Sequence, residues 1–184
     1  MSWFGLGTTG KDPADRPRGY GVTKRPGRLV LGNPKDFFIA HSYNLSLERK
    51  YFDVIIHGNK DNTGIQLPDG SWITYDGAQL AELIRSTKAW NGKKPIRLLA
   101  CNAGECERSY AQVVSDELDV DVAAPLHKVM LLPDGNFSIG AKPAPPATAP
   151  DFRVFRPRTK AQIEYDSPSH VSKAWPFKDP RPTS

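Results

Sequence analysis

Cysteine is scarce in this sequence, and long apolar stretches are absent. The 184 residues include only two cysteines, Cys101 and Cys106, which excludes a fold held together by a disulfide framework. No apolar run approaches the roughly 18 residues that a membrane-spanning helix needs. The apolar start, residues 1–7, is too short and too rich in glycine for the core of a classical signal peptide. We therefore expect neither a membrane span nor a secretory signal.

A charge excess of one sign is also missing from the middle of the chain. The net charge is +5, but residues 28–142 carry 13 basic and 14 acidic side chains, so the excess lies in the two ends. Nucleic-acid binding domains carry a basic patch or stripe on the folded part. We therefore expect no nucleic-acid partner.

Proline and glycine divide the chain into three parts. Residues 1–27 are rich in glycine, proline and charge and predict a flexible lead-in. Nine of the 17 prolines lie in residues 143–184, which predicts an extension with little regular structure apart from one strand at 152–155. Residues 28–142 remain as the folded domain.

Strands and helices alternate along residues 28–142. Short β-branched apolar runs predict strands, apolar residues three and four positions apart predict helices, and two Pro-Asp-Gly turns predict hairpins. The expected strands cover 28–31, 36–40, 51–56, 95–100 and 120–124, the hairpins join 65–67 to 72–75 and 129–132 to 137–139, and the helices cover 76–88 and 108–118. This order predicts an α/β fold with a mostly parallel central sheet, helices on both faces and β-hairpin insertions.

Two of the predicted interior strands end in a residue that can do chemistry. His57 and Gly58 follow the strand at 51–56, and Cys101 follows the strand at 95–100. Ligands bind beyond the carboxyl ends of parallel strands, so neighbouring strands would bring the imidazole and the thiol to one edge. An imidazole can activate a thiol and then protonate a leaving group. The backbone N–H groups of Gly58 and Cys101 could form an oxyanion hole.

The same residues also have a structural interpretation. A single cysteine after an apolar strand is usually a small buried hydrophobe, and a single His-Gly pair is usually a turn. A zinc site formed by His57, Cys101 and Cys106 is a further alternative, although we expect no metal. The pairing of two such strand ends favours catalysis over these alternatives.

The motif also resembles a known group of enzymes. His57-Gly58, then a hairpin and a helix, then Ile96–Asn102, is similar to the caspase–hemoglobinase-like cysteine peptidases, and most similar to the autoprocessing protease domains of large bacterial toxins. Residues 98–104 also resemble the C-terminal modules of Rhs and other polymorphic toxins. The resemblance covers about residues 28–140. It implies a caspase-like fold, Cys101 as nucleophile and His57 as general base.

The resemblance further implies a biological setting. Such modules reach their targets through a secretion system or as part of a larger toxin, and they act in a reducing cytoplasm. The implied partners are a protein or peptide substrate and either a host target or a cognate immunity protein. No cofactor is required, although some members are activated by a polyanion such as an inositol phosphate. Lys93, Lys94 and Arg97 are the candidate basic cluster, but a solvated turn explains the two lysines better.

Other positions complete the expected site. Members of the same group often orient the histidine with an upstream acid, for which Asp36 and Asp53 are the candidates. Asn102 and Gly104, which follow Cys101, and His127, which comes just after the strand at 120–124, are candidates from their positions for lining a substrate pocket. Caspases have Gln-Ala before the cysteine, whereas this chain has Leu99-Ala100, which argues against caspase-like specificity for aspartate.

Two other functions fit the same residues. A Cys–His pair also serves deamidation and other acyl transfer, because a fold does not determine a reaction. Alternatively, the domain is a catalytically inactive module that binds a partner.

Overall fold

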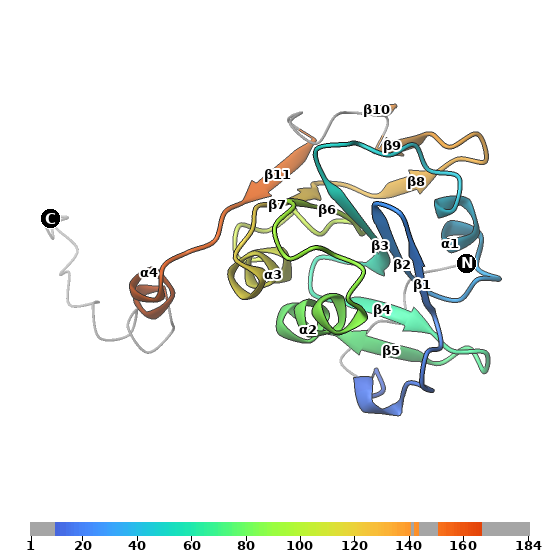
Figure 1. Cartoon of the computed structure of the whole chain (residues 1–184), viewed down its shortest axis with the longest axis horizontal. Helices are drawn as coiled ribbons and strands as arrows, with labels where there is room; N and C mark the ends of the chain where they lie inside the picture. Colours follow the sequence, from blue (N-terminus) through green and yellow to red (C-terminus); the bar gives the residue numbers. More distant parts are fainter. Residues whose placement is uncertain (1–9, 141, 144–150, 167–184) are drawn as a thin grey trace, which may run out of the picture.

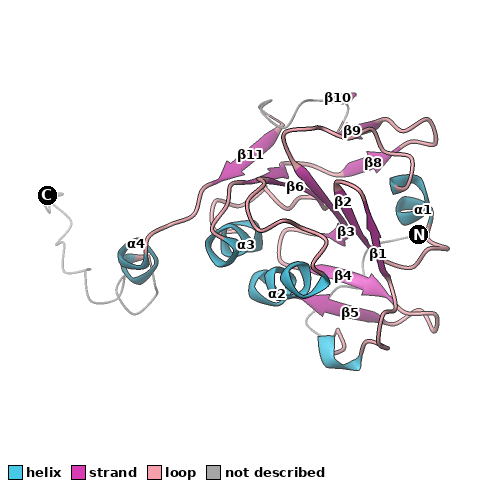
Figure 2. Cartoon of the chain, in the orientation of Figure 1, coloured by secondary structure: helices cyan, strands magenta, loops and turns pink. Residues whose placement is uncertain are grey.

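A computed structural model describes residues 10–140, 142–143 and 151–166. Strands and short helices alternate along these residues (Figures 1 and 2). In chain order the elements are η1 (Pro13–Asp15), β1 (Val22–Arg25), β2 (Arg28–Leu31), α1 (Phe37–Ser42), β3 (Phe52–Gly58), β4 (Thr63–Gln66), β5 (Trp72–Tyr75), α2 (Gly77–Thr87), β6 (Ile96–Leu99), α3 (Tyr110–Leu118), β7 (Val122–Pro125), β8 (Val129–Leu131), β9 (Phe137–Ile139), β10 (Lys142–Pro143), β11 (Phe152–Phe155) and α4 (Lys160–Tyr165).

The central sheet is mostly parallel, as the alternation of elements predicts. Its strands run in the order β1-β2-β3-β6-β7-β11. The four inner strands pair in parallel, whereas β1 and β11 pair antiparallel at the two edges. The β4–β5 hairpin extends from the end of β3, and β8, β9 and β10 form a separate small sheet. The protein is therefore an α/β domain with hairpin insertions.

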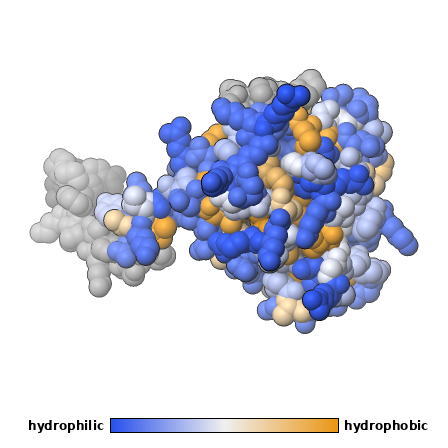
Figure 3. Space-filling view, viewed as in Figure 1, coloured by the Kyte–Doolittle hydropathy of each residue, from blue (hydrophilic) through white to orange (hydrophobic). Residues whose placement is uncertain are grey.

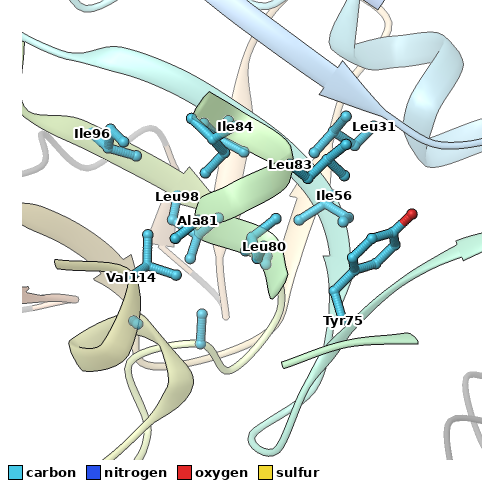
Figure 4. Packing of buried hydrophobic residues seen from close by; sticks show 14 of the residues in the cluster. Leu31, Ile56, Tyr75, Leu80, Ala81, Leu83, Ile84, Ile96, Leu98 and Val114 are labelled. Atoms are coloured by element: carbon cyan, nitrogen blue, oxygen red, sulfur yellow. The ribbon is translucent and has the colours of Figure 1, made fainter. Parts of the chain in front are cut away.

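Helices cover both faces of this sheet. On one face, Leu80 and Ile84 of α2 and Val114 of α3 pack on Ile56 and Leu98 of the inner strands (Figure 4). On the other face, Ile39 of the short helix α1 belongs to a second apolar cluster, to which the β8–β9 hairpin also contributes. Inner strands with two covered faces need apolar residues at nearly every position, which explains why all seven residues of β3 are buried.

The surface is correspondingly polar. The view in Figure 3 is mostly hydrophilic, with smaller hydrophobic areas between the charged side chains. Phe37 at the start of α1 and Tyr165 in α4 are the most exposed large apolar side chains among the described residues. Within those residues, no helix has both the length and the apolar character needed to cross a bilayer.

The two longer helices, α2 and α3, begin within two residues of their predicted starts at 76 and 108. The Asp76 side chain caps α2 by accepting a hydrogen bond from the Gln79 N–H. The Gln79 side chain in turn accepts a hydrogen bond from the Asp76 N–H, which completes a capping box. Ser109 caps α3 through the Ala111 N–H. Because each cap satisfies backbone N–H groups that a helix start leaves free, these polar residues define the starts of both helices.

The segment 36–40 differs from the prediction of a strand. It forms the N-terminal part of α1, because the Asp36 side chain accepts a hydrogen bond from the Ile39 N–H and acts as the N-cap. The apolar residues after Asp36 therefore form one side of a helix, and Ile39 on that side packs into the core. A short apolar run cannot be assigned to strand or helix by periodicity alone, and the cap decides it here.

The ends of the chain contain more regular structure than expected. Within the predicted flexible lead-in, β1 pairs along its whole length with β2, and Lys11 forms a bridge with Ile73 of β5. In the proline-rich extension, the strand predicted at 152–155 is present as β11. The helix α4, which was not predicted, follows it, and Arg158 just before α4 pairs with Asp116 of α3 at 2.8 Å. Residues 1–9, 144–150 and 167–184 lie outside the described residues.

A buried ion pair joins β3 to β6. Asp53 and Arg97 lie directly opposite each other in the parallel register, and the guanidinium Nε and Nη2 donate to the two carboxylate oxygens at 2.6 and 2.7 Å. Burial raises the pKa of Asp53, and Arg97 only partly offsets this effect. Asp53 and Arg97 thus form a bidentate ion pair in the interior. Asp53 is not available to orient His57, and Arg97 is not available to bind a polyanion.

The Asp53–Arg97 pair generates a stability prediction. Replacing Arg97 with methionine leaves the fully buried Asp53 without its bidentate partner, which should cost about 3 kcal/mol or more in unfolding free energy. The control is Arg85→Met, because Arg85 pairs with Glu82 on the surface and surface pairs contribute at most about 1 kcal/mol. Urea denaturation measures both variants. Equal, small losses in the two would contradict this view of the interior.

Candidate active site

The register between β3 and β6 brings the predicted pair of residues to one end of the sheet. Ile55 pairs with Leu99 at the last paired position, and two residues further along each strand stand His57 and Cys101. Side chains alternate between the two faces of a sheet. Ile55 and Leu99 belong to the core cluster on the α1 side, so His57 and Cys101 lie on that same side, at adjacent strand ends.

His57 is buried and held by an acid. Its exposed fraction is 7%, and its Nε2 donates to Asp36 Oδ1 at 2.8 Å. The same carboxylate caps α1, so the start of this helix positions the histidine. Of the two candidate orienting acids, the structure therefore brings Asp36 to His57.

The electrostatics of Asp36 favour its ionised form. Burial on its own would raise the pKa of Asp36. The hydrogen bond and charge of His57, together with the backbone N–H groups of Ile39 and Phe38, outweigh burial and lower this pKa. A carboxylate that stays ionised can stabilise positive charge on the imidazole when the ring takes up a proton.

Two aromatic rings flank the imidazole. The Phe38 ring lies 4.9 Å from the His57 ring, and the Trp72 ring lies 5.4 Å away in an edge-on arrangement. Phe38 comes from α1 and Trp72 from β5, and both are half-buried. These rings restrict the imidazole and give the site apolar walls. Sequence analysis did not identify either ring as part of the site.

The Cys101 thiol is partly buried against β8. Its Sγ donates to the Val129 carbonyl oxygen at 3.6 Å and accepts from the Val129 N–H at 3.4 Å. Burial raises the pKa of Cys101, although the Val129 N–H, the charge of Lys128 and the cysteine's own N–H act in the opposite direction. In this conformation the sulfur is thus a neutral thiol held by a backbone group.

Two backbone N–H groups at this end of the sheet have no backbone acceptor among the described residues. In β3, the Phe52 N–H donates to Pro95 on the β6 side and the Asp53 N–H to Gly27 on the β2 side, so Gly58, like Phe52, directs its N–H toward β6. The β3–β6 pairing has already ended there, at Leu99. Cys101 lies just beyond that last pair, and its N–H likewise meets no backbone carbonyl.

The loop after Cys101 is fixed to the neighbouring strand. Asn102 has a left-handed backbone, with φ of 58°, and its N–H donates to the His127 carbonyl at 3.1 Å. The Gly104 N–H donates to Pro125 of β7 at 2.8 Å. A side chain on Gly104 would come within 2.4 Å of a backbone oxygen of Ala124, so this glycine is required by close packing.

The predicted pocket residues therefore have mixed roles. Gly104 packs closely on Ala124 and Pro125 of β7. The Asn102 amide donates to Glu105 at 3.0 Å, and the His127 side chain is exposed. Asn102 follows Cys101 in the chain, and its backbone N–H donates to the His127 carbonyl, so both residues lie at this end of the sheet.

The residues proposed for the zinc alternative do not gather. Cys106 is exposed while Cys101 is half-buried. Across residues 10–140, 142–143 and 151–166, no group of three or more His, Cys, Asp or Glu side chains is placed to hold a metal ion.

Comparison with known proteins places this domain in a family. A family profile described as a domain of unknown function, DUF8616, matches residues 28–139. The chain belongs to this family. The matched region runs from β2 to β9 and contains Asp36, His57 and Cys101. Comparison with curated proteins found no match.

The Asp36–His57 contact generates a prediction about pH. Asparagine is also a good N-cap, so Asp36→Asn should keep α1 and remove the negative charge. Because the pKa of Asp36 is lowered in the folded protein, its stabilising contribution is complete above the unfolded value of about 3.9 and is lost as the pH falls through the folded value. The variant should be about 1 kcal/mol less stable at pH 6, and this difference should shrink as the pH falls below about 3.9.

The control for this measurement is Asp76→Asn, at the exposed N-cap of α2. It removes the same charge from the same kind of position, but without a histidine contact. Urea midpoints for the parent and both variants between pH 2.5 and pH 7 provide the comparison. A difference for Asp36→Asn that stays constant with pH would contradict the lowered pKa.

Proposed function

We propose that this protein is a cysteine peptidase of the caspase-like type in which Cys101 is the nucleophile and His57 the general base. The observation that carries the proposal is the register of β3 and β6, which puts His57, already oriented by Asp36, and Cys101 at adjacent strand ends on the same face. Parallel strand ends are where open α/β sheets bind ligands. The parallel sheet covered on both faces supports the caspase-like architecture.

The reaction begins with proton transfer. His57 Nε2 is held by Asp36, so Nδ1 takes the proton from the Cys101 thiol, and the resulting sulfur lone pair attacks the carbonyl carbon of the scissile peptide. The C–S bond forms while the carbonyl π electrons move to oxygen. The negative charge on that oxygen is stabilised by the Gly58 and Cys101 N–H groups. The Asp36 carboxylate stabilises the imidazolium.

The second half regenerates the enzyme. The tetrahedral intermediate collapses as the imidazolium protonates the leaving amine, which breaks the C–N bond and leaves a thioester on Cys101. Water then attacks this thioester, giving its proton to His57, and the protonated imidazole returns it to the departing sulfur. The Cys101 side chain must leave the Val129 backbone before the first step. The neutral thiol at Val129 is accordingly the resting state.

The biological setting is part of the proposal. We place the domain in a bacterial toxin or secreted effector, where it cleaves its own chain or a target protein and where an immunity protein would block it. Delivery by a secretion system and action in a reducing cytoplasm fit the need for a free thiol. A polyanion remains a candidate activator, but Arg97 is not its ligand.

A peptide library tests the proposal. The parent is Cys106→Ser, which removes the exposed second thiol. We expect this parent to cleave library peptides, and we expect Cys101→Ala and His57→Ala in the same background to lose at least about 1,000-fold in rate, as losses of catalytic residues do. Mass spectrometry of the products and of the protein itself detects cleavage in trans and self-trimming. Cleavage that persists in Cys101→Ala would exclude this sulfur as the nucleophile.

Alkylation separates the alternatives when no peptide is cut. Iodoacetamide labels Cys101 in the Cys106→Ser parent, and the rate at pH 7 should fall about tenfold in His57→Ala if the imidazole activates the thiol. His57-dependent labelling without peptide cleavage would favour deamidation or other acyl transfer. Equal labelling in both proteins, without cleavage, would favour the partner-binding module.

A further inference from the structure

Tyr110 has a buried hydroxyl with no hydrogen-bond partner. It is the first residue of α3, and its side chain is 6% exposed. The hydroxyl oxygen is buried and makes no hydrogen bond among the described residues. A phenolic hydroxyl that is buried usually finds a partner, because leaving it unpaired is costly. Phenylalanine would fill the same space without that cost.

The hydroxyl lies directly beneath the candidate site. A Cβ built on Gly58 would come within 2.7 Å of the Tyr110 hydroxyl oxygen and within 2.7 Å of the Ala100 Cβ. Gly58 follows His57, and Ala100 precedes Cys101. The phenol approaches from the α2–α3 side of the sheet, where Tyr110 belongs to the core cluster, whereas the thiol and the imidazole lie on the opposite side.

The electrostatics agree with this placement. Burial raises the pKa of Tyr110 well above its ordinary value, and negative charge on Cys101 raises it further. The hydroxyl therefore stays protonated and remains a donor, and it lies close enough to sense charge at Cys101.

Three donors thus gather where β3 and β6 separate. They are the Gly58 N–H, the Cys101 N–H and the Tyr110 hydroxyl, and none of them has a backbone acceptor. Donors held in place without acceptors are suited to a negative charge that is present only during a reaction. We propose that the Tyr110 hydroxyl is a third donor to the oxyanion formed when Cys101 attacks a carbonyl. This inference rests on the proposed peptidase function and names an additional catalytic residue for it.

The test is Tyr110→Phe, with Tyr75→Phe as its matched control. The Tyr75 hydroxyl is also buried and has no hydrogen-bond partner within bonding distance. It lies on β5, where the strand β4 separates it from Gly58, and its charged neighbour is Arg16 and not Cys101. Both changes remove one oxygen atom from the interior. In urea denaturation both variants should be as stable as the Cys106→Ser parent or more stable, because each loses an unpaired polar group.

Kinetics then separate the two tyrosines. On a peptide cleaved by the parent, Tyr110→Phe should lower kcat about 100-fold, as loss of one oxyanion donor does, and leave KM within about threefold. Tyr75→Phe should change neither constant by more than about twofold. Alkylation of Cys101 by iodoacetamide forms no oxyanion, so its rate should be unchanged in Tyr110→Phe.

The possible outcomes distinguish a failure of the Tyr110 donor role from a failure of the peptidase proposal. A Tyr110→Phe variant that cleaves as fast as the parent overturns the third donor and leaves the Cys–His mechanism intact. A variant that loses cleavage and alkylation together shows a general disturbance of the site, which also overturns the donor role. If the parent cleaves no peptide, the peptidase proposal fails and the inference falls with it.

Discussion

The parallel pairing of β3 with β6 is the constraint on which the rest of this structure depends. It places Asp53 opposite Arg97 in the interior and, four residues later, His57 level with Cys101 beyond the last paired residues. A shift of β6 by one residue would turn Arg97 to the opposite face from Asp53 and leave both charges buried without a partner. The same register therefore stabilises the core and arranges the candidate site.

Much of the fold could be predicted from local patterns. The apolar runs of β3 and β6, the turns of both hairpins and the cap at Asp76 are all read from residues close together in the chain. The short helix α1 could not be assigned in this way, because Phe37 to Ala40 is too brief a run to show a period and only the Asp36 cap distinguishes it. The edge strand β1 was missed because its four residues alternate weakly within a glycine- and proline-rich segment.

The candidate site, like the fold, could be predicted only where local sequence was sufficient. His57 and Cys101 could be found because each ends an interior strand, a feature visible in the sequence. The choice between Asp36 and Asp53 depended on long-range contacts: Asp53 meets Arg97 across the sheet, and Asp36 reaches His57 only through the helix that it caps. Phe38 and Tyr110 were not identified as site residues, since an aromatic residue in an apolar stripe carries no local sign that it also faces a reacting group.

The contact between Cys101 and Val129 affects how readily the thiol is oxidised. Peroxide attacks the thiolate of an exposed, acidic cysteine, and the sulfenic acid formed can proceed irreversibly to sulfinic acid. A neutral, half-buried sulfur that is hydrogen-bonded to a backbone amide and carbonyl reacts slowly with such an oxidant. The exposed Cys106 would therefore be oxidised before Cys101.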